Sequence, residues 1–244
     1  MSITEQFTDA VAAAAGELPG LELLPERLAR ACAQVLPVDG AGISLFFAAD
    51  RRLPLGASDP TSAVAERLQF TVGEGPCLSS HAEGHVIVAD EDDIRTRWPA
   101  FHDDLVSRTP IRSVVSLPLD DEFSELGVLD LYLVPPHDPG RLDLALGRAV
   151  AGEVTAALRA TNGRTSVDAD GPAWLDAPAA GRRSLVWQAI GFVNTGLGVR
   201  SPDALAMLRA HAYGEGLTLD DLAARVVDRD VPLERLAIGA DTAS

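Results

Sequence analysis

The segment Gly73–Cys77, with the sequence GEGPC, is the first place where residue types and spacing suggest chemistry. Its two glycines permit a tight turn, and Pro76 suits the first turn of a helix. The pattern therefore predicts Cys77 at a helix N-terminus, where the helix dipole lowers the pKa of a thiol. Cys77 is a candidate redox-active or ligand-facing thiol. The alternative is a small, buried and inert side chain.

Catalysis by this thiol would need a second thiol near it, because thiol–disulfide exchange requires a resolving cysteine. The chain has two cysteines, and the other one, Cys32, falls in a distant predicted helix. We therefore expect no enzymatic activity and assign no catalytic residue. A thiol reductase that uses Cys77 is the remote alternative.

Two histidines and an acidic run are the candidate metal-binding residues of the sequence. His81 and His85 are four residues apart, a spacing that could face one metal ion on a helix. Gly84 and a strand beginning at His85 break that geometry, and a third ligand is not evident, so we predict no metal site. The acidic run 90–93 could attract a cation, but we interpret it as an exposed loop. No cofactor is predicted.

Helices and strands must position these residues, and hydrophobic periodicity indicates where the helices and strands lie. Stripes of apolar residues, or a cap followed by proline, predict helices at 2–15, 21–36, 58–70, 97–108 and 138–160. Short apolar runs predict strands at 42–48, 52–58, 85–90, 113–119 and 127–134, the last two joined by a polar hairpin loop. This order predicts an α+β fold, in which an antiparallel sheet carries flanking helices.

A change of composition then marks a second domain. Residues 161–181 are rich in glycine, proline, aspartate and small residues, which is typical of a linker. Three short helices separated by glycine-bearing turns follow within 188–227 and predict a small all-α domain. We divide the chain into an N-terminal helical segment, an α+β domain, a linker, a three-helix domain and a tail, at 1–20, 21–160, 161–181, 182–236 and 237–244.

Charge and composition narrow the functional classes. The net charge is -16, and all 20 basic residues are arginine. Residues 182–236 hold seven arginines and seven acids and are therefore neutral, which predicts weak non-specific binding to nucleic acid. No run approaches the ~18 apolar residues of a membrane span, and the N-terminus is polar and acidic rather than signal-like. We expect a cytoplasmic protein without membrane partners.

The first domain resembles a GAF domain of the kind found in actinobacterial regulators. The residues that carry the resemblance are GEGPC at 73–77, RWPAF at 97–101, SVVSLPL at 113–119 and LGVLDLY at 126–132. GAF domains commonly hold a small molecule between the sheet and the overlying helices. The resemblance implies a sensor of a small-molecule or protein signal, with candidate ligand-pocket residues Cys77, Asp90, Trp98 and Phe101. For the two aromatic side chains we favour a place in the core over a role as a ligand platform.

The second domain resembles an ANTAR domain, the RNA-binding module of transcription antitermination regulators. The matching residues are Ala189, Gly191, Ala204, Leu208, Arg209, Ala212, Leu219, Leu222 and Ala223. This resemblance implies transcription regulation, in which the domain binds paired RNA hairpins of leader transcripts and stabilises an antiterminator. The order GAF then ANTAR is itself a known regulator architecture.

Specific RNA recognition uses exposed cations, amides and aromatic groups. Arg209 follows Leu208 and should therefore point away from the core of its own domain. The candidate RNA-binding residues are Arg182, Arg183, Gln188, Asn194, Arg200, Arg209, His211, Arg225 and Arg229.

Two other functions remain open for the second domain. It could be a DNA-binding helix-turn-helix, although its third helix begins with Asp220 and Asp221, which would face phosphates. It could also serve in a sensor or adaptor that binds no nucleic acid. A three-helix unit of this size buries little surface alone, so we expect it to lean on a partner chain or a longer helix, which favours a homodimer.

Overall fold

The computed structural model describes residues 1–46, 52–119, 127–162 and 173–238. The predicted polar hairpin loop, residues 163–172 of the predicted linker and most of the predicted tail lie outside these residues. We call residues 1–162 the sheet unit and residues 178–238 the helical unit.

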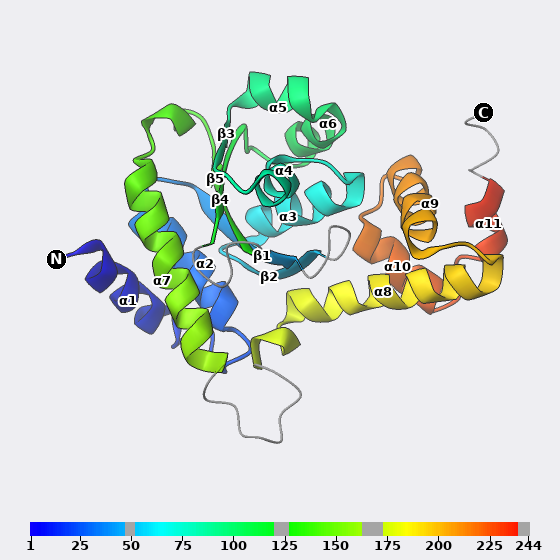
Figure 1. The fold of residues 1–244 in the computed structure, drawn as a ribbon, viewed down its shortest axis with the longest axis horizontal. Helices are drawn as coiled ribbons and strands as arrows, with labels where there is room; N and C mark the ends of the chain where they lie inside the picture. The colour runs from blue at the N-terminus through cyan, green and yellow to red at the C-terminus, as the bar shows by residue number, and fades with distance from the viewer. Residues whose placement is uncertain (47–51, 120–126, 163–172, 239–244) are drawn as a thin grey trace.

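The sheet unit is built on five antiparallel strands in the order β2-β1-β5-β4-β3 (Figure 1). The strands are β1 (Gly40–Phe46), β2 (Arg52–Ala57), β3 (Ile87–Ala89), β4 (Ser113–Pro118) and β5 (Gly127–Leu133). All five lie where apolar runs predict strands, and the α+β fold is confirmed.

Helices cover both faces of this sheet (Figure 1). One face carries α1 (Ile3–Ala14), α2 (Leu24–Val35) and α7 (Leu144–Asn162). The other carries α3 (Pro60–Val72), α4 (Pro76–Glu83), α5 (Glu91–Arg97) and α6 (Pro99–Arg108). Side chains of a strand alternate between faces, so Leu129 and Leu131 enter the first core while Asp130 and Tyr132 face the second group of helices. β5 thus directs polar groups toward α3.

Local sequence explains where several helices begin and end. Asp59 accepts hydrogen bonds from the backbone N–H groups of Thr61 and Ser62 and so caps α3. Gly73 ends α3 with a φ of 79°, a conformation that favours glycine. The acidic run 90–93 is not the loop that we predict from sequence: Asp90 caps α5 and Asp93 completes a reciprocal capping box. The prediction is wrong because aspartates in a first helical turn satisfy free N–H groups and the helix dipole.

The helical unit consists of α8 (Pro178–Leu197), α9 (Ser201–Gly214), α10 (Leu219–Val227) and the short α11 (Leu233–Ile238). The three predicted helices are present, and α8 begins four residues before the predicted domain boundary, with Pro178 at its first position. Buried leucine, valine and alanine side chains of all four helices form one small core. A short 3-10 helix, Ala173–Asp176, precedes α8.

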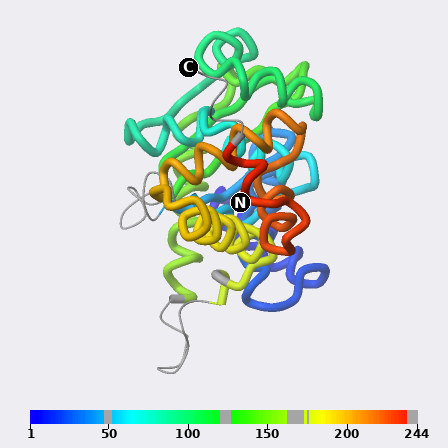
Figure 2. Tube along the Cα trace, turned by 90° about the vertical axis from the view of Figure 1, so that its right-hand side faces the viewer, coloured from blue at the N-terminus to red at the C-terminus, as the bar shows by residue number. Residues whose placement is uncertain are grey.

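The helical unit leans on the sheet unit. Figure 2, which views the molecule from the right-hand side of Figure 1, shows α8 to α11 lying in front of the sheet unit. The contacts run from α8 to β2 and from α9 and α10 to α3, and Phe70 of α3 belongs to the core of the helical unit. The support that the small unit needs therefore comes, in this structure, from the same chain. No helix among the described residues has the length and apolar character needed to cross a membrane.

Candidate functional site

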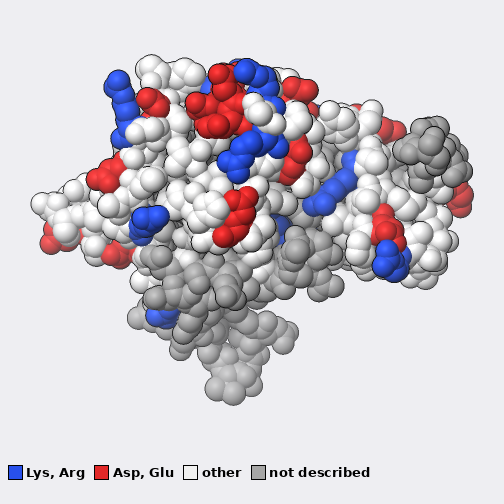
Figure 3. Space-filling view, turned by 45° about the horizontal axis from the view of Figure 1, so that its top comes forward, with Lys and Arg blue, Asp and Glu red and all other residues white. Residues whose placement is uncertain are grey.

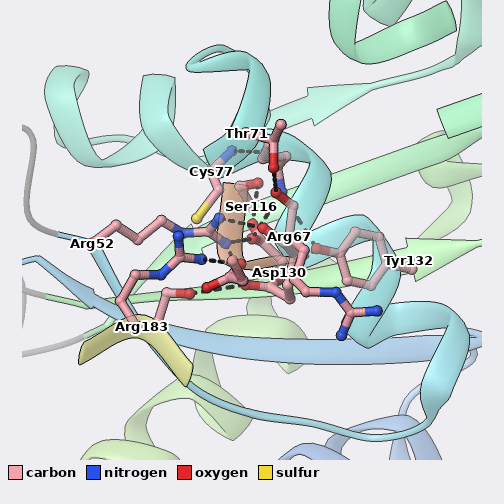
Figure 4. A network of polar contacts seen from close by, with 12 residues as sticks. Arg52, Arg67, Thr71, Cys77, Ser116, Asp130, Tyr132 and Arg183 are labelled. Carbon is pink, nitrogen blue, oxygen red and sulfur yellow. Dashed lines mark hydrogen bonds and ion pairs between the residues drawn. The ribbon is translucent and has the colours of Figure 1, made fainter. Parts of the chain in front are cut away.

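A network of buried polar groups lies between α3 and the sheet (Figure 4). Its centre is Glu66, which is 3% exposed. The hydroxyl groups of Tyr132 and Ser44 donate to its two carboxylate oxygens at 2.5 and 2.8 Å. Arg52, at the start of β2, pairs with the same carboxylate and donates through Nη1 to the backbone oxygen of Glu66 at 2.7 Å. A buried charge is tolerated only when it is paired and hydrogen-bonded, and Glu66 meets both conditions.

Asp130 of β5 extends this network. It accepts a hydrogen bond from Ser116 Oγ at 2.5 Å and one from Gln69 Nε2 at 3.3 Å, and it lies 3.5 Å from Arg52 Nη2. Burial and the neighbouring charge of Glu66 raise the pKa of Asp130 to about 7, against the opposing effect of Arg52. Glu66 and Asp130 share the single guanidinium of Arg52. Asp130 therefore holds a proton more readily than an ordinary aspartate does.

Cys77 lies beside this network, near the N-terminus of α4. Gly75 makes the turn before it with a φ of 141°, and the backbone N–H of Cys77 donates to Gln69 Oε1 at 2.9 Å. The thiol is fully buried, and burial raises its pKa well above the usual value. The predicted helix N-terminus is therefore present, but the predicted lowering of the thiol pKa is wrong because loss of solvent outweighs the helix dipole.

The structure separates the other predicted ligand-pocket residues. Trp98 and Phe101 are buried in one hydrophobic cluster, and Trp98 donates through Nε1 to Ser79 Oγ at 3.1 Å. Asp90 is exposed at the start of α5, while Cys77 packs in a different cluster with Phe46. The four residues therefore do not line one common cavity.

The two histidines of the segment 81–85 serve other contacts. The ring of His81 stacks on Phe46 with 3.9 Å between ring centroids, and His85 lies 3.1 Å from Glu83. In the part of the chain that the structure describes, no three His, Cys, Asp or Glu side chains form a group that could hold a metal ion.

The contact between the two units centres on Phe70. The guanidinium of Arg183, from α8, lies 3.5 Å from the centroid of the Phe70 ring, and that of Arg209, from α9, lies 5.0 Å from it. The ring of Trp187 meets Phe70 edge-on at 6.2 Å. Arg209 Nε also donates to the backbone oxygen of Phe70 at 3.1 Å. A single aromatic side chain of the sheet unit thus contacts two cations of the helical unit.

Two further hydrogen bonds cross the same contact. The backbone N–H of Leu219, at the start of α10, donates to Thr71 Oγ1 at 2.9 Å. Arg108 Nη2, at the end of α6, donates to the backbone oxygen of Gly216 at 2.7 Å. The N-terminus of α10 therefore faces the sheet unit.

Arg183 is fully buried, which corrects the prediction that it is an exposed RNA-binding cation. Its nearest acid is Asp220, with 3.4 Å between Nη2 and Oδ2, yet none of its three guanidinium nitrogens has a hydrogen-bond partner. Burial lowers the pKa of Arg183 to about 9, and Asp220 opposes that shift. Arg209 is also not directed to solvent as predicted, because α9 packs against α3 and its side chain lies along Phe70.

The other predicted RNA-binding residues do not form one basic surface. Arg200 pairs with Asp203 at 3.1 Å, and Glu215 lies 3.3 Å from His211 and 3.6 Å from Arg225. Asn194 Nδ2 donates to Ser201 Oγ at 2.9 Å. Arg182, Gln188, Arg200 and Arg229 are exposed, and of these Arg200 is paired with Asp203. The face shown in Figure 3 carries basic and acidic side chains interspersed.

Sequence reasoning does not identify the residues that organise these sites. Arg52, Glu66, Asp130 and Phe70 are absent from the predicted set. A signal exists for two of them: Asp130 interrupts an apolar strand and Glu66 lies within a mostly buried helix, and charged residues occupy such positions only when paired. Phe70 has no such signal, because an aromatic residue on an amphipathic helix is ordinary.

Comparison with known proteins finds partial similarity to solved structures only. The sequence matches no family model and no curated protein. A GAF domain of a phosphoenolpyruvate-protein phosphotransferase from Coxiella burnetii aligns with 67% of this chain and 98% of its own, at 12% identity and a TM-score of 0.44. Free methionine-R-sulfoxide reductase from Neisseria meningitidis aligns with 68% of this chain and 95% of its own, at 14% identity and a TM-score of 0.43.

A third similar structure is a transcription factor. CepR2 from Burkholderia cenocepacia, an N-acylhomoserine lactone dependent LuxR family member, aligns with 65% of this chain and 95% of its own, at 19% identity and a TM-score of 0.46. All three TM-scores are below 0.5 and all three identities are below 25%, so these similarities establish neither a family nor an activity for this chain.

Proposed function

We propose that this chain is a signal-responsive transcription regulator, in which a GAF-like sheet unit controls an ANTAR-like helical unit that binds RNA hairpins. The observation that carries the proposal is the position of Phe70 between Arg183 and Arg209. Both arginines are among the residues predicted to contact RNA. In the docked arrangement, the side chain of Phe70 contacts both guanidinium groups instead of RNA.

The docked arrangement and RNA binding therefore compete for the same cations. Specific RNA recognition needs accessible arginines that contact phosphates and unpaired bases. Arg183 has no exposed surface here, and Arg209 is partly covered by Phe70. A signal that separates the two units would return both guanidinium groups to solvent. The sheet unit would then control RNA binding through a shift between two populations.

The burial of Arg183 favours a releasable contact. A guanidinium that is removed from water without hydrogen bonds carries a desolvation cost, which its attraction to Asp220 and Phe70 must offset. Exposure of Arg183 on separation relieves that cost. A modest signal could therefore change the balance between docked and released states.

DNA binding is the weaker alternative. A recognition helix presents its N-terminal residues to base edges. At the N-terminus of α10, Leu219 is bonded to Thr71, Asp220 is buried beside Arg183, and Asp221 shares a hydrogen bond with Thr218. The two aspartates would also repel DNA phosphates after the units separate, which favours RNA, bound elsewhere on the unit.

We also propose that the chain is not a thiol enzyme. Burial raises the pKa of both Cys77 and Cys32, so neither supplies a thiolate at neutral pH. A cytoplasmic location and a homodimer remain part of the proposal and rest on the sequence alone.

The test is a binding titration of the full chain with an RNA of two small-loop hairpins, in excess duplex competitor DNA. Phe70→Ala removes the ring between the arginines and is expected to tighten RNA binding by about tenfold, as a shift of ~1.4 kcal/mol toward the released state requires. Arg108→Ala breaks a single bond between the units, the one to Gly216, together with an ion pair to Asp104 within α6, and is expected to tighten binding less. Arg225→Glu with Arg229→Glu is expected to weaken binding.

Three outcomes would contradict the proposal. Absence of hairpin binding by wild type, Phe70→Ala and Arg108→Ala alike would leave a protein adaptor as the better account. Tighter binding to the competitor DNA would indicate a DNA-binding regulator. Equal affinities of wild type and both docking variants would exclude control by the sheet unit. Circular dichroism of each variant checks that the helical unit is folded.

A further inference from the structure

A cleft lies at the junction of the two units, apart from the predicted ligand-pocket residues. Its volume is about 250 Å³, and its walls come from α2, β2 and α3 of the sheet unit and from α8 and α10 of the helical unit. The volume is smaller than the roughly 300–1,000 Å³ of pockets that hold drug-sized ligands. A small metabolite would therefore contact both units at once.

Two buried carboxylates line this cleft, and they differ in their partners. Glu66 is fully satisfied by Tyr132, Ser44 and Arg52. Asp220 is 5% exposed, and its Oδ2 atom accepts no hydrogen bond, although Arg183 lies 3.4 Å away. Buried polar atoms in folded proteins almost always have a partner. Oδ2 is closed off beside Arg183, so a ligand would meet Asp220 through the part of its carboxylate that lines the cleft, and a cationic donor suits a carboxylate best.

Two arginines that line the cleft have the opposite requirement, because they need a hydrogen-bond acceptor rather than a donor. Arg67 of α3 and Arg182 of α8 form no ion pair within the described residues. Figure 4 shows the side chain of Arg67 directed away from Arg52 and Asp130. Arg182 is exposed, whereas its neighbour in sequence, Arg183, is buried. Both free guanidinium groups are suited to a carboxylate.

The rest of the lining limits the net charge and the size of a ligand. The cleft is lined by four carboxylates and three guanidinium groups, so neither a strong anion nor a strong cation is favoured. Small apolar residues, among them Pro54, Ala57 and Ala63, form part of the wall and suit a short hydrocarbon segment.

We propose that this cleft binds a small zwitterion of the amino-acid type. The ammonium group pairs with the carboxylate of Asp220, and the carboxylate of the ligand is held by Arg67 and Arg182. Because Arg67 belongs to the sheet unit and the other two belong to the helical unit, the bound zwitterion bridges the units. It stabilises the docked arrangement and so lowers affinity for RNA, a consequence that rests on the proposed function.

The experiment is isothermal titration calorimetry of the full chain with each of the twenty standard L-amino acids. At least one is expected to bind with a stoichiometry of one. Arg182→Gln and Asp220→Asn are each expected to weaken that binding by tenfold or more. Arg148→Gln, an exposed substitution on α7 outside the cleft, is the matched control and is expected to bind like wild type. Because Arg182 is exposed, its substitution leaves the fold intact even if Asp220→Asn does not.

The experiments distinguish failure of the zwitterion site from failure of the proposed RNA-binding function. If none of the twenty amino acids binds, or if Arg182→Gln binds as tightly as wild type, the zwitterion site is overturned. The hairpin titration without amino acid tests RNA binding on its own. An amino acid that binds through Arg182 but leaves hairpin affinity unchanged supports the site and overturns its regulatory consequence.

Discussion

Two fully buried arginines show how differently one side chain can be used in this molecule. Arg52, in the sheet unit, is bonded to the backbone of Glu66 and paired with two carboxylates. Arg183, in the helical unit, has one acid at 3.4 Å and no hydrogen bond. Burial acts to lower the pKa of both, yet the acidic groups around Arg52 raise its pKa above the usual value, while that of Arg183 falls to about 9.

The difference separates a buried cation that is hydrogen-bonded from one that is not. Removal of either partner from a satisfied buried pair leaves an uncompensated charge, so the pair is hard to break. A buried guanidinium without hydrogen bonds contributes little to stability. Its release to solvent therefore costs little free energy. The comparison predicts that substitutions at the two positions differ strongly in their effect on stability.

The largest effect is expected for Arg52→Met. The substitution leaves Glu66 and Asp130 buried together without a cation, and we expect the free energy of unfolding to fall by about 3–5 kcal/mol. Urea denaturation followed by circular dichroism measures the change. A loss below about 1 kcal/mol would show that the network does not depend on Arg52.

An intermediate effect is expected from pH. Because the pKa of Asp130 is raised to about 7 from 3.8, the folded state holds a proton that the unfolded state releases between those values. The contribution of Asp130 to stability is therefore full at acidic pH and is lost as pH rises toward 7, by up to about 1.4 kcal/mol per pH unit.

Asp130→Asn removes this titration while keeping the shape of the side chain. Unfolding free energies of wild type and variant, measured from pH 4.5 to 8, should therefore converge at the acidic end and diverge as pH rises. Parallel curves would show that Asp130 titrates near its ordinary value.

The smallest effect is expected for Arg183→Met. The substitution removes a guanidinium that makes no hydrogen bond but leaves Asp220 without its ion-pair partner, so we expect the free energy of unfolding to fall by less than the roughly 3–5 kcal/mol expected for Arg52→Met. The same urea titration tests this. A loss comparable to that of Arg52→Met would remove the distinction between the two arginines and make the contact between units a structural one.

The sequence predicts the fold better than it predicts these sites. Strand positions follow from apolar runs, and helix starts follow from caps such as Asp59, because both signals are local. Arg183 and Arg209 illustrate the limit. Periodicity assigns a residue to a face of its own helix, but it does not reveal that α3 supplies Phe70 to cover that face. The buried pairing of Arg52 with Glu66 likewise depends on contacts between distant elements.

The compact arrangement along α3 has an evolutionary consequence. Glu66 and Gln69 belong to the network of the sheet unit, whereas Phe70 and Thr71 belong to the contact with the helical unit. These four positions fall within two helical turns, so a substitution that shifts α3 disturbs both at once. The sheet network and the contact between the units therefore cannot drift independently in this segment. Homologous chains should change residues 66–71 together with positions 183 and 209, or leave them unchanged.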